Sequence, residues 1–197
     1  MKHSLHVTDV KHMGKPKNLE TKPDLLERIA NYVLENGLID LSLRPLAAAL
    51  DTNARMLLYH FGSKEQLVIE VLGAIQQRQQ TALEQIIVQK LAPKTRFKRL
   101  WVWLSAPEQI PFLRTLFEVE LRAIDGTLIY QEFARASLLA WMEVVGFNLT
   151  RASPATINFV TAALVGLLLD RFSTGDIERT EAAFNALTNM LYKGGLL

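Results

Sequence analysis

The stretch ARMLLYHFGSKEQL, residues 54–67, decides the fold, because it carries the signals for one helix that ends and another that begins. Gly62 is a helix stop, since glycine is common just past the last turn of a helix. Ser63, followed three residues later by Gln66, forms a capping box, which predicts a helix that opens at Lys64. We therefore expect a short helix over residues 53–61 and a long one from residue 64 to about residue 90.

Two further helices are predicted before this stretch. Pro23 suits a first helical turn, and apolar residues then recur at helical spacing until Gly37. Ser42 is a good N-cap for a second helix, and the polar residues 51–53 separate that helix from the next. Two short helices joined by about three residues are typical of a helix-turn-helix.

The segment 52–61 has two faces when it is placed on a helical wheel. The apolar face, which we expect to pack on the two preceding helices, comprises Ala54, Leu57, Leu58 and Phe61. The opposite face is rich in hydrogen-bonding groups and comprises Thr52, Asn53, Arg55, Met56, Tyr59 and His60. In a helix-turn-helix the second helix enters the major groove of DNA and the first crosses the backbone. The opposite face is therefore predicted to meet a duplex, and the alternative is an ordinary solvated surface.

The side chains of this face suit particular parts of DNA. Arg55 can donate two parallel hydrogen bonds to guanine O6 and N7, and Asn53 can pair with adenine or reach a phosphate. Met56 offers an apolar contact to a thymine methyl group. Tyr59 and His60 lie further along the helix and are better placed for phosphates.

The starts of two helices add candidate phosphate contacts. Lys64 lies beside Ser63 at a helix N-terminus, where the dipole and free N–H groups favour an anion. Ser42 and Arg44 open the second helix and could hold the DNA backbone in the same way. Phosphate contacts position a protein on DNA and base contacts specify the sequence. The predicted DNA-binding residues are Ser42, Arg44, Thr52, Asn53, Ala54, Arg55, Met56, Tyr59, His60 and Lys64.

Residues 25–67 resemble the N-terminal DNA-binding domain of the tetracycline-repressor (TetR) family of transcriptional regulators. The resemblance rests on LRPLAAALDTNARMLLYHFGSKEQL, residues 43–67, and above all on YHFGSK within it. It implies that Lys64 is the family's phosphate-binding lysine and that residues 52–56 face the bases. The chain departs from the family in two places. Asp51 stands where the turn usually carries glycine, and Leu58, next to Tyr59, stands where the family has a tyrosine, so that tyrosine's phosphate contact cannot be transferred to Leu58.

The remainder of the chain is predicted to be helical, because no stretch shows sustained alternation of apolar and polar residues. The fold class is therefore all-α, with an N-terminal three-helix helix-turn-helix domain followed by a larger helical bundle. The expected domains are a flexible tail over residues 1–21 and a DNA-binding domain over 22–68, and the resemblance implies that residues 69–197 form an effector-binding and dimerisation domain. The further helices are expected over residues 94–105, 111–125, 127–149, 154–172 and 176–192.

Two apolar stripes near the C-terminus predict a dimer interface, in which two helices pair with their copies to give a four-helix contact. A two-fold dimer reads two half-sites one helical turn apart, which the resemblance also implies. The alternative is that both stripes are ordinary core within one chain. The predicted interface residues are Ile157, Val160, Leu164, Leu168, Phe184, Leu187 and Leu191.

Aromatic residues gather in the middle of the chain, as they would around a pocket for an apolar or aromatic effector. Glu118 and Arg122 are four residues apart, so a surface ion pair is the simpler interpretation for them. Aromatic residues at helical spacing are also typical of plain core. The predicted ligand-binding residues are Trp101, Trp103, Phe117, Glu120, Tyr130, Phe133 and Trp141.

Composition excludes several classes of protein. The chain has no cysteine, which excludes disulfides and thiolate metal sites and fits a cytoplasmic protein. His60 is the one histidine beyond the tail, and it lacks the Glu-x-x-His spacing of di-metal bundles, so neither a metal nor a cofactor is expected. No phosphate loop or nucleophile elbow is visible, so the chain is not expected to be an enzyme. The longest apolar run, residues 159–169, is too short to span a bilayer.

The predicted function is that of a DNA-binding transcriptional regulator. The resemblance implies a homodimeric repressor of a palindromic operator that a small, largely apolar ligand releases. The expected partners are operator DNA, a second copy of the chain and the effector, with no membrane. The alternative is a helical small-molecule-binding or adaptor protein without DNA-binding activity.

Overall fold

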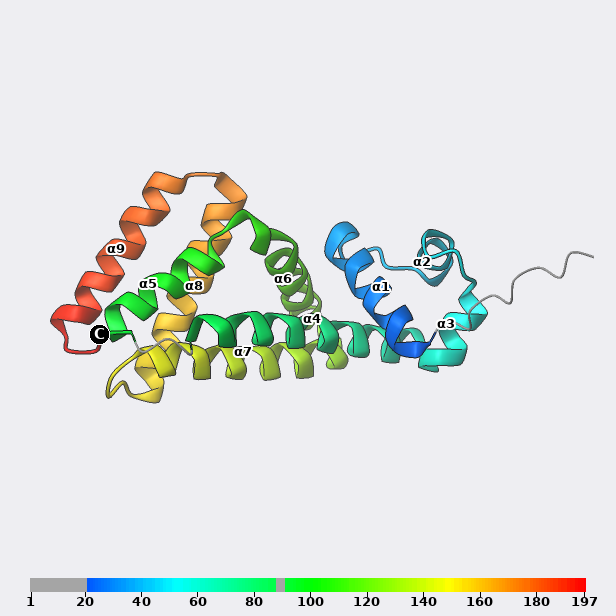
Figure 1. The fold of residues 1–197 in the computed structure, drawn as a ribbon, viewed down its shortest axis with the longest axis horizontal. Helices are drawn as coiled ribbons and strands as arrows, with labels where there is room; N and C mark the ends of the chain where they lie inside the picture. The colour runs from blue at the N-terminus through cyan, green and yellow to red at the C-terminus, as the bar shows by residue number, and fades with distance from the viewer. Residues whose placement is uncertain (1–20, 88–90) are drawn as a thin grey trace, which may run out of the picture.

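The computed structural model describes residues 21–87 and 91–197, and these residues form an elongated molecule made of helices, without a strand among them (Figure 1). Three short helices lie together at one end, and the long helix α4 (Lys64–Ile87) runs from them along the body of the molecule. The all-α prediction is confirmed. The predicted tail lies outside the described residues except for Thr21, whose side chain accepts the N–H of Asp24 at the start of the first helix.

The three N-terminal helices are α1 (Lys22–Asn36), α2 (Leu43–Ala49) and α3 (Ala54–Phe61). Their positions confirm the three predicted helices, with Pro23 in the first turn of α1 and Gly37 just past its end. The side chains that join these helices are almost wholly enclosed. They are Leu25, Ile29, Val33, Leu46, Leu57 and Phe61.

The prediction that Leu58 packs in this core is wrong, because its side chain is 41% exposed. Leu57 and Phe61 are the fully buried residues of α3, and Ala54 is half-buried. On the wheel Leu58 lies at the edge of the apolar arc that is nearer to Arg55, while His60, at the opposite edge, is half-buried. The face of α3 that docks on the protein is therefore turned toward His60, and Leu58 belongs to the outer face.

The C-terminal part is a bundle of helices. It contains α5 (Pro93–Leu104), the 3-10 turn η1 (Pro107–Gln109), α6 (Ile110–Ile124), α7 (Leu128–Asn148), α8 (Pro154–Thr174) and α9 (Ile177–Lys193). Within the bundle, α7 packs against α4, α5, α6 and α8. Helix α7 runs beside α4, and α8 and α9 form an antiparallel pair at the end far from α1–α3 (Figure 1). The helices predicted for this region are confirmed to within a few residues. The expected end of α4 near residue 90 falls outside the described residues.

Helix α6 ties the bundle to the end of α1 through three charged residues on successive turns. Arg114 Nη2 donates to the carbonyl of Leu34 over 2.6 Å, and Arg122 Nη2 donates to the carbonyl of Ile39 over 2.8 Å. Between them, Glu118 accepts the backbone N–H of Leu38. The expected surface pair of Glu118 with Arg122 is wrong, since the ion pair that Glu118 makes is with Arg114, at 3.9 Å.

Candidate nucleic-acid interface and internal cavity

The turn between α2 and α3 is built to present the start of α3. Asp51 lies in the left-handed region with a φ of 50°, a conformation that glycine, asparagine and aspartate adopt most readily. Asn53 is the N-cap of α3, and its Oδ1 accepts the N–H of Met56 over 3.0 Å. The Nδ2 group of Asn53 is left to donate outward, because the cap bond uses the oxygen.

The outer face of α3 is formed by Arg55 and Tyr59, both exposed, together with Leu58. Tyr59 is 79% exposed, and its ring meets the edge of His60 at a centroid distance of 5.2 Å. Thr52 and Met56 border this face and are half-buried. A long cation, a phenol and an apolar side chain thus project together from a helix whose opposite side is fixed in the core.

His60 differs from the sequence prediction. Its side chain is half-buried, with the ring beside Phe61 at 6.5 Å between centroids. Its Nε2 is enclosed by protein and has no hydrogen-bond partner among the described residues. This nitrogen points into the domain, so the expected phosphate contact through Nε2 is not available in this conformation.

Three exposed residues at helix starts lie on the same domain. Ser42 is the N-cap of α2 and makes no side-chain cap bond, and Arg44 follows it. Lys64 is the first residue of α4, and the Oγ of Ser63 accepts the N–H of Gln66 over 3.1 Å, which confirms the predicted helix start. The second bond of the predicted capping box is not formed, because the Gln66 side chain donates to Glu70 and the Ser63 N–H donates to the carbonyl of Phe61. Backbone and Ser63 hydrogen bonds lower the pKa of Glu65 at the same helix start.

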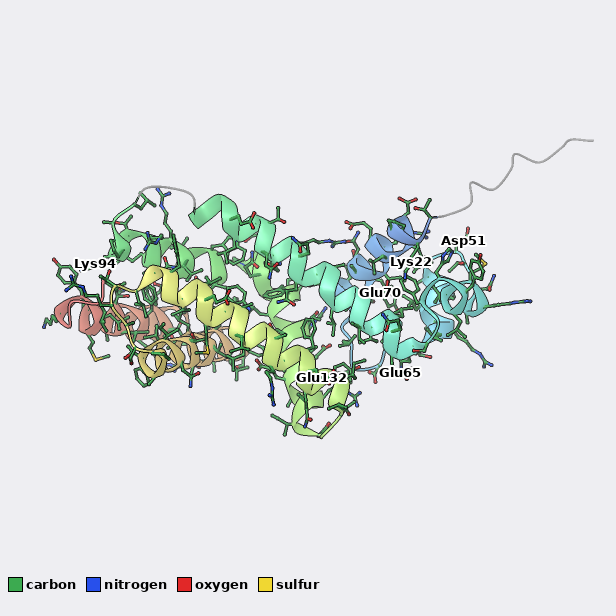
Figure 2. All side chains as sticks on the ribbon, turned by 90° about the horizontal axis from the view of Figure 1, so that it is seen from below. Lys22, Asp51, Glu65, Glu70, Lys94 and Glu132 are labelled. Carbon is green, nitrogen blue, oxygen red and sulfur yellow. The ribbon has the colours of Figure 1, made fainter. Side chains whose placement is uncertain are left out.

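An ion pair anchors α1 to the first turns of α4. Lys22 Nζ lies 2.8 Å from Glu70 Oε2, and the two side chains face each other in Figure 2. Lys22 also lies over the ring of Phe61, 5.1 Å from its centroid. The helix that bears Lys64 is thereby held against the helix that supports α3.

The bundle contains a cavity of about 140 Å³ between α4, α6 and α7. Buried Leu83 and Phe112 form its floor, and exposed Gln80 and Glu143 stand at its rim. A smaller apolar cavity of about 30 Å³ lies on the other side of Trp141, which lines both. The remaining lining residues of the larger cavity are Gln76, Gln79, Ala140, Trp141 and Val144.

The predicted ligand residues are distributed unevenly around this space. Trp141 lines the larger cavity, and Trp103 packs against it at 6.4 Å between ring centroids. Phe133 lines a separate space of about 10 Å³. Phe117 and Tyr130 are half-buried against the core, and burial raises the pKa of Tyr130.

Glu120 and Trp101 stand apart from the larger cavity. Burial raises the pKa of Glu120, which is half-buried on α6. Trp101 is 2% exposed and stacks on Phe184 of α9 at 4.6 Å, and its Nε1 donates to Glu181 over 2.9 Å. The assignment of Trp101 to the ligand site is therefore wrong, because its ring is a core element between α5 and α9.

Most residues of the cavity wall were not among the predicted ligand-binding residues. The glutamines of α4 lie at positions 76, 79 and 80, and Leu83 follows, which is the spacing of one helix face. A polar stripe on a long helix looks like solvated surface until the neighbouring helix is known. Within the described residues no group of three or more histidine or acidic side chains is arranged to hold a metal ion.

The predicted dimer-interface residues lie inside the chain. Ile157 is half-buried against the core, and the other six are buried. The assignment of these six to an interface is wrong, and the alternative of intrachain core is confirmed for Val160, Leu164, Leu168, Phe184, Leu187 and Leu191.

The outward side of α8 is nevertheless apolar. Phe159 is 65% exposed and Leu169 is 50% exposed, with the small residues Ala162 and Gly166 between them. Met190 of α9 is also exposed. In the described part of the chain, α8 is the one helix whose length and mean hydropathy, 1.4, would be sufficient for a membrane span. Such an uncovered apolar face is typical of a contact surface.

Residues 25–71 match the family model described as bacterial regulatory proteins of the tetR family. No curated protein matches the chain. Among solved structures, a transcriptional regulator from Rhodococcus sp. Rha1 has a TM-score of 0.74 at 16% identity, covering 88% of this chain and 97% of its own. The multidrug binding protein EbrR complexed with imidazole has a TM-score of 0.66 at 20% identity, and the match covers 94% of this chain and 97% of that protein. AibR in complex with isovaleryl coenzyme A and operator DNA has a TM-score of 0.59 at 16% identity, and the match covers 86% of this chain and 97% of that protein.

Proposed function

The chain belongs, through its residues 25–71, to the tetR family of bacterial regulatory proteins, and we propose that it is a homodimeric repressor of a palindromic operator. A small, largely apolar ligand in the bundle releases it. The protein acts in the cytoplasm on double-stranded DNA, and it is not an enzyme. The domain division that accompanies this function is residues 22–68 for DNA binding and residues 69–197 for the effector and the partner subunit.

The observation that carries the proposal is the outer face of α3. Arg55 and Tyr59 project from a helix of only 8 residues whose Leu57 is fully buried. Arg55 reads a guanine, and the free Nδ2 of Asn53 donates to a base or a phosphate. Lys64, Ser42 and Arg44 hold the backbone on either side of the groove. Such a short helix gains affinity when two copies act together.

Dimerisation is supported by the uncovered face of α8 rather than by the stripes that the sequence suggested. Phe159, Ala162, Gly166 and Leu169 lie on one side of this helix and are exposed in the single chain. Small residues between larger ones let two helices approach closely, and a two-fold axis places the same face against itself. A second copy on α8 would remove this apolar surface from water.

Release by a ligand is supported by the path from the cavity to α1. Phe112 lines the cavity and lies on α6, two residues before Arg114. Arg114, Glu118 and Arg122 hold the end of α1. A ligand that prefers one position of α6 shifts α1, and with it the spacing of the two copies of α3, toward the state that no longer fits successive grooves.

Selection of bound fragments from random DNA, followed by gel retardation at two salt concentrations, tests the proposal. The expected result is a site with dyad symmetry whose half-sites are about one helical turn apart, bound less tightly at high salt. A variant with both Arg55 and Lys64 replaced by alanine serves as the negative control. Absence of retention of any fragment at low salt would contradict the proposal and favour the adaptor protein.

A further inference from the structure

The larger cavity has an unusual combination of walls for a site that takes a purely apolar compound. Phe112 and Trp141 contribute two aromatic faces, with ring centroids 6.2 Å apart and planes inclined by 49°. Three glutamines of α4 line the side opposite α7. Aromatic walls and amide groups together suit a flat compound that carries hydrogen-bonding groups at one edge.

Glu143 supplies the charge of the site. Among the described residues that line the cavity it is the single ionisable one, and it stands exposed at the rim. No cation of residues 21–87 or 91–197 forms an ion pair with it. A carboxylate at the mouth of an aromatic cavity attracts a cation, and the indole face of Trp141 favours the same sign of charge.

Gln79 adds a hydrogen-bond acceptor that lacks a donor among the described residues. This acceptor is its Oε1, which is buried. A buried acceptor without a partner costs free energy, and a bound N–H group would remove that cost. Gln79 lies on α4 and Glu143 on α7, and both residues line the cavity between the two helices, so a small rotation of the Gln79 amide would bring its Oε1 to a bound N–H.

We propose that the cavity binds an aromatic cation whose charge lies on an N–H-bearing group, such as an amidinium or a protonated amine. The aromatic part lies against the rings of Phe112 and Trp141, which line the cavity side by side. The charged end faces Glu143, and an N–H donates to the side-chain amide of Gln79. This inference rests on the proposed function in one respect, which is that the effector binds in this cavity.

Three compounds with one ring system and different charges test the inference by calorimetric titration of the full chain. They are naphthalene-2-carboxamidine, which is a cation, the neutral naphthalene-2-carboxamide, and the anionic naphthalene-2-carboxylate. The amidine is expected to bind about tenfold or more tightly than the amide, and the carboxylate to bind most weakly. Equal affinity of the amidine and the amide would overturn the proposal.

Glu143→Gln isolates the charge, since an exposed side chain is replaced by one of the same shape. It is expected to bring the affinity of the amidine to within about threefold of the amide while leaving the amide unchanged. Glu132→Gln is the matched control, because Glu132 is an exposed carboxylate three turns earlier on α7 and does not line this cavity (Figure 2). An undiminished preference in Glu143→Gln, or an equal loss in Glu132→Gln, would overturn the proposal.

Gln79→Leu tests the acceptor separately. The amidine and the amide both carry N–H donors, so both are expected to bind more weakly, while the carboxylate is unaffected. Gel retardation of the same samples separates this inference from the proposed function. DNA binding without a preference for the amidine contradicts only the ligand class, and a preference for the amidine without DNA binding contradicts only the regulator.

Discussion

The carboxylate of Glu118 on α6 accepts a hydrogen bond from the backbone N–H of Leu38, a residue 80 positions earlier in the chain. Leu38 follows the end of α1, so the bond joins the bundle to the domain that bears α3. Arg114 and Arg122, one turn to either side, donate to carbonyls of the same region. The last turn of α1 and the loop after it are thus hydrogen-bonded to three side chains of one helix, two of which donate and one of which accepts.

Glu118→Ala is expected to lower the free energy of unfolding by about 1–3 kcal/mol, because the N–H of Leu38 loses its acceptor in a half-buried place. Urea unfolding followed by circular dichroism measures this loss. Glu132→Ala, an exposed change on α7, is the control and is expected to stay within about 0.5 kcal/mol of the parent. A Glu118→Ala protein as stable as the control would mean that the contact is not formed in solution.

Gly37→Ala is expected to destabilise the protein by about 1–3 kcal/mol. Gly37 has a φ of 85° and a ψ of 177°, a region open to glycine alone, and an added Cβ would lie 2.8 Å from Glu118 Oε1. Gly73→Ala is the matched control, because Gly73 lies inside α4 with nothing within 4 Å of an added Cβ. That change is expected to stabilise the helix by about 0.5–1 kcal/mol, so thermal unfolding should move the two variants in opposite directions.

Arg55→Ala is expected to weaken operator binding by about 1–3 kcal/mol and to relax the base preference at one position of each half-site. Lys64→Ala is expected to weaken binding to all sequences alike and to reduce the salt dependence, because it removes a phosphate contact. Competition against a set of single-base operator variants distinguishes the two effects. Parental binding by both variants would show that another surface meets DNA.

The positions of the helices could be predicted because their ends carry local signals. Asn53 and Ser153 cap α3 and α8 through their side chains, and Gly62 and Gly175 end α3 and α8 with positive φ. These interactions involve residues within one turn of the helix end, so they are visible in the sequence itself.

The partners of each helix face could not be predicted in the same way. Periodicity correctly marks Leu164 and Phe184 as lying on apolar faces, but both are covered by the same chain. Trp101 is likewise apolar and helical in spacing, and its neighbours Phe184 and Glu181 come from a helix about 80 residues later. Leu58 was misplaced because α3 packs on both α2 and α4, and the direction of the docked face depends on both.

Glu120→Gln is expected to raise the melting temperature at neutral pH. Burial raises the pKa of Glu120 above 4.5, so the folded chain keeps this proton at pH values where the unfolded chain has released it. The folded state then binds more protons, and the stability of the parent falls as pH rises from 4.5 through the raised pKa. The difference between variant and parent should therefore grow over this range and be smallest below it. Melting curves of both proteins from acid to neutral pH measure this, and a difference that does not change with pH would contradict it.

Leu169→Glu is expected to convert the proposed dimer to a monomer, because it places a charge on the apolar face of α8 that the proposal assigns to the contact with a second copy. An unpaired charge in a buried contact costs about 3–5 kcal/mol, which corresponds to an increase of about 100-fold or more in the dissociation constant of the dimer. Ile124→Glu is the control, since Ile124 is 81% exposed at the end of α6, away from α8. Sedimentation velocity over a range of concentrations measures both variants, and circular dichroism verifies that both are folded. A dimer that persists in Leu169→Glu would place the contact between subunits on another face. A monomer that also binds operator fragments more weakly would show that DNA binding by α3 depends on the pairing of two copies.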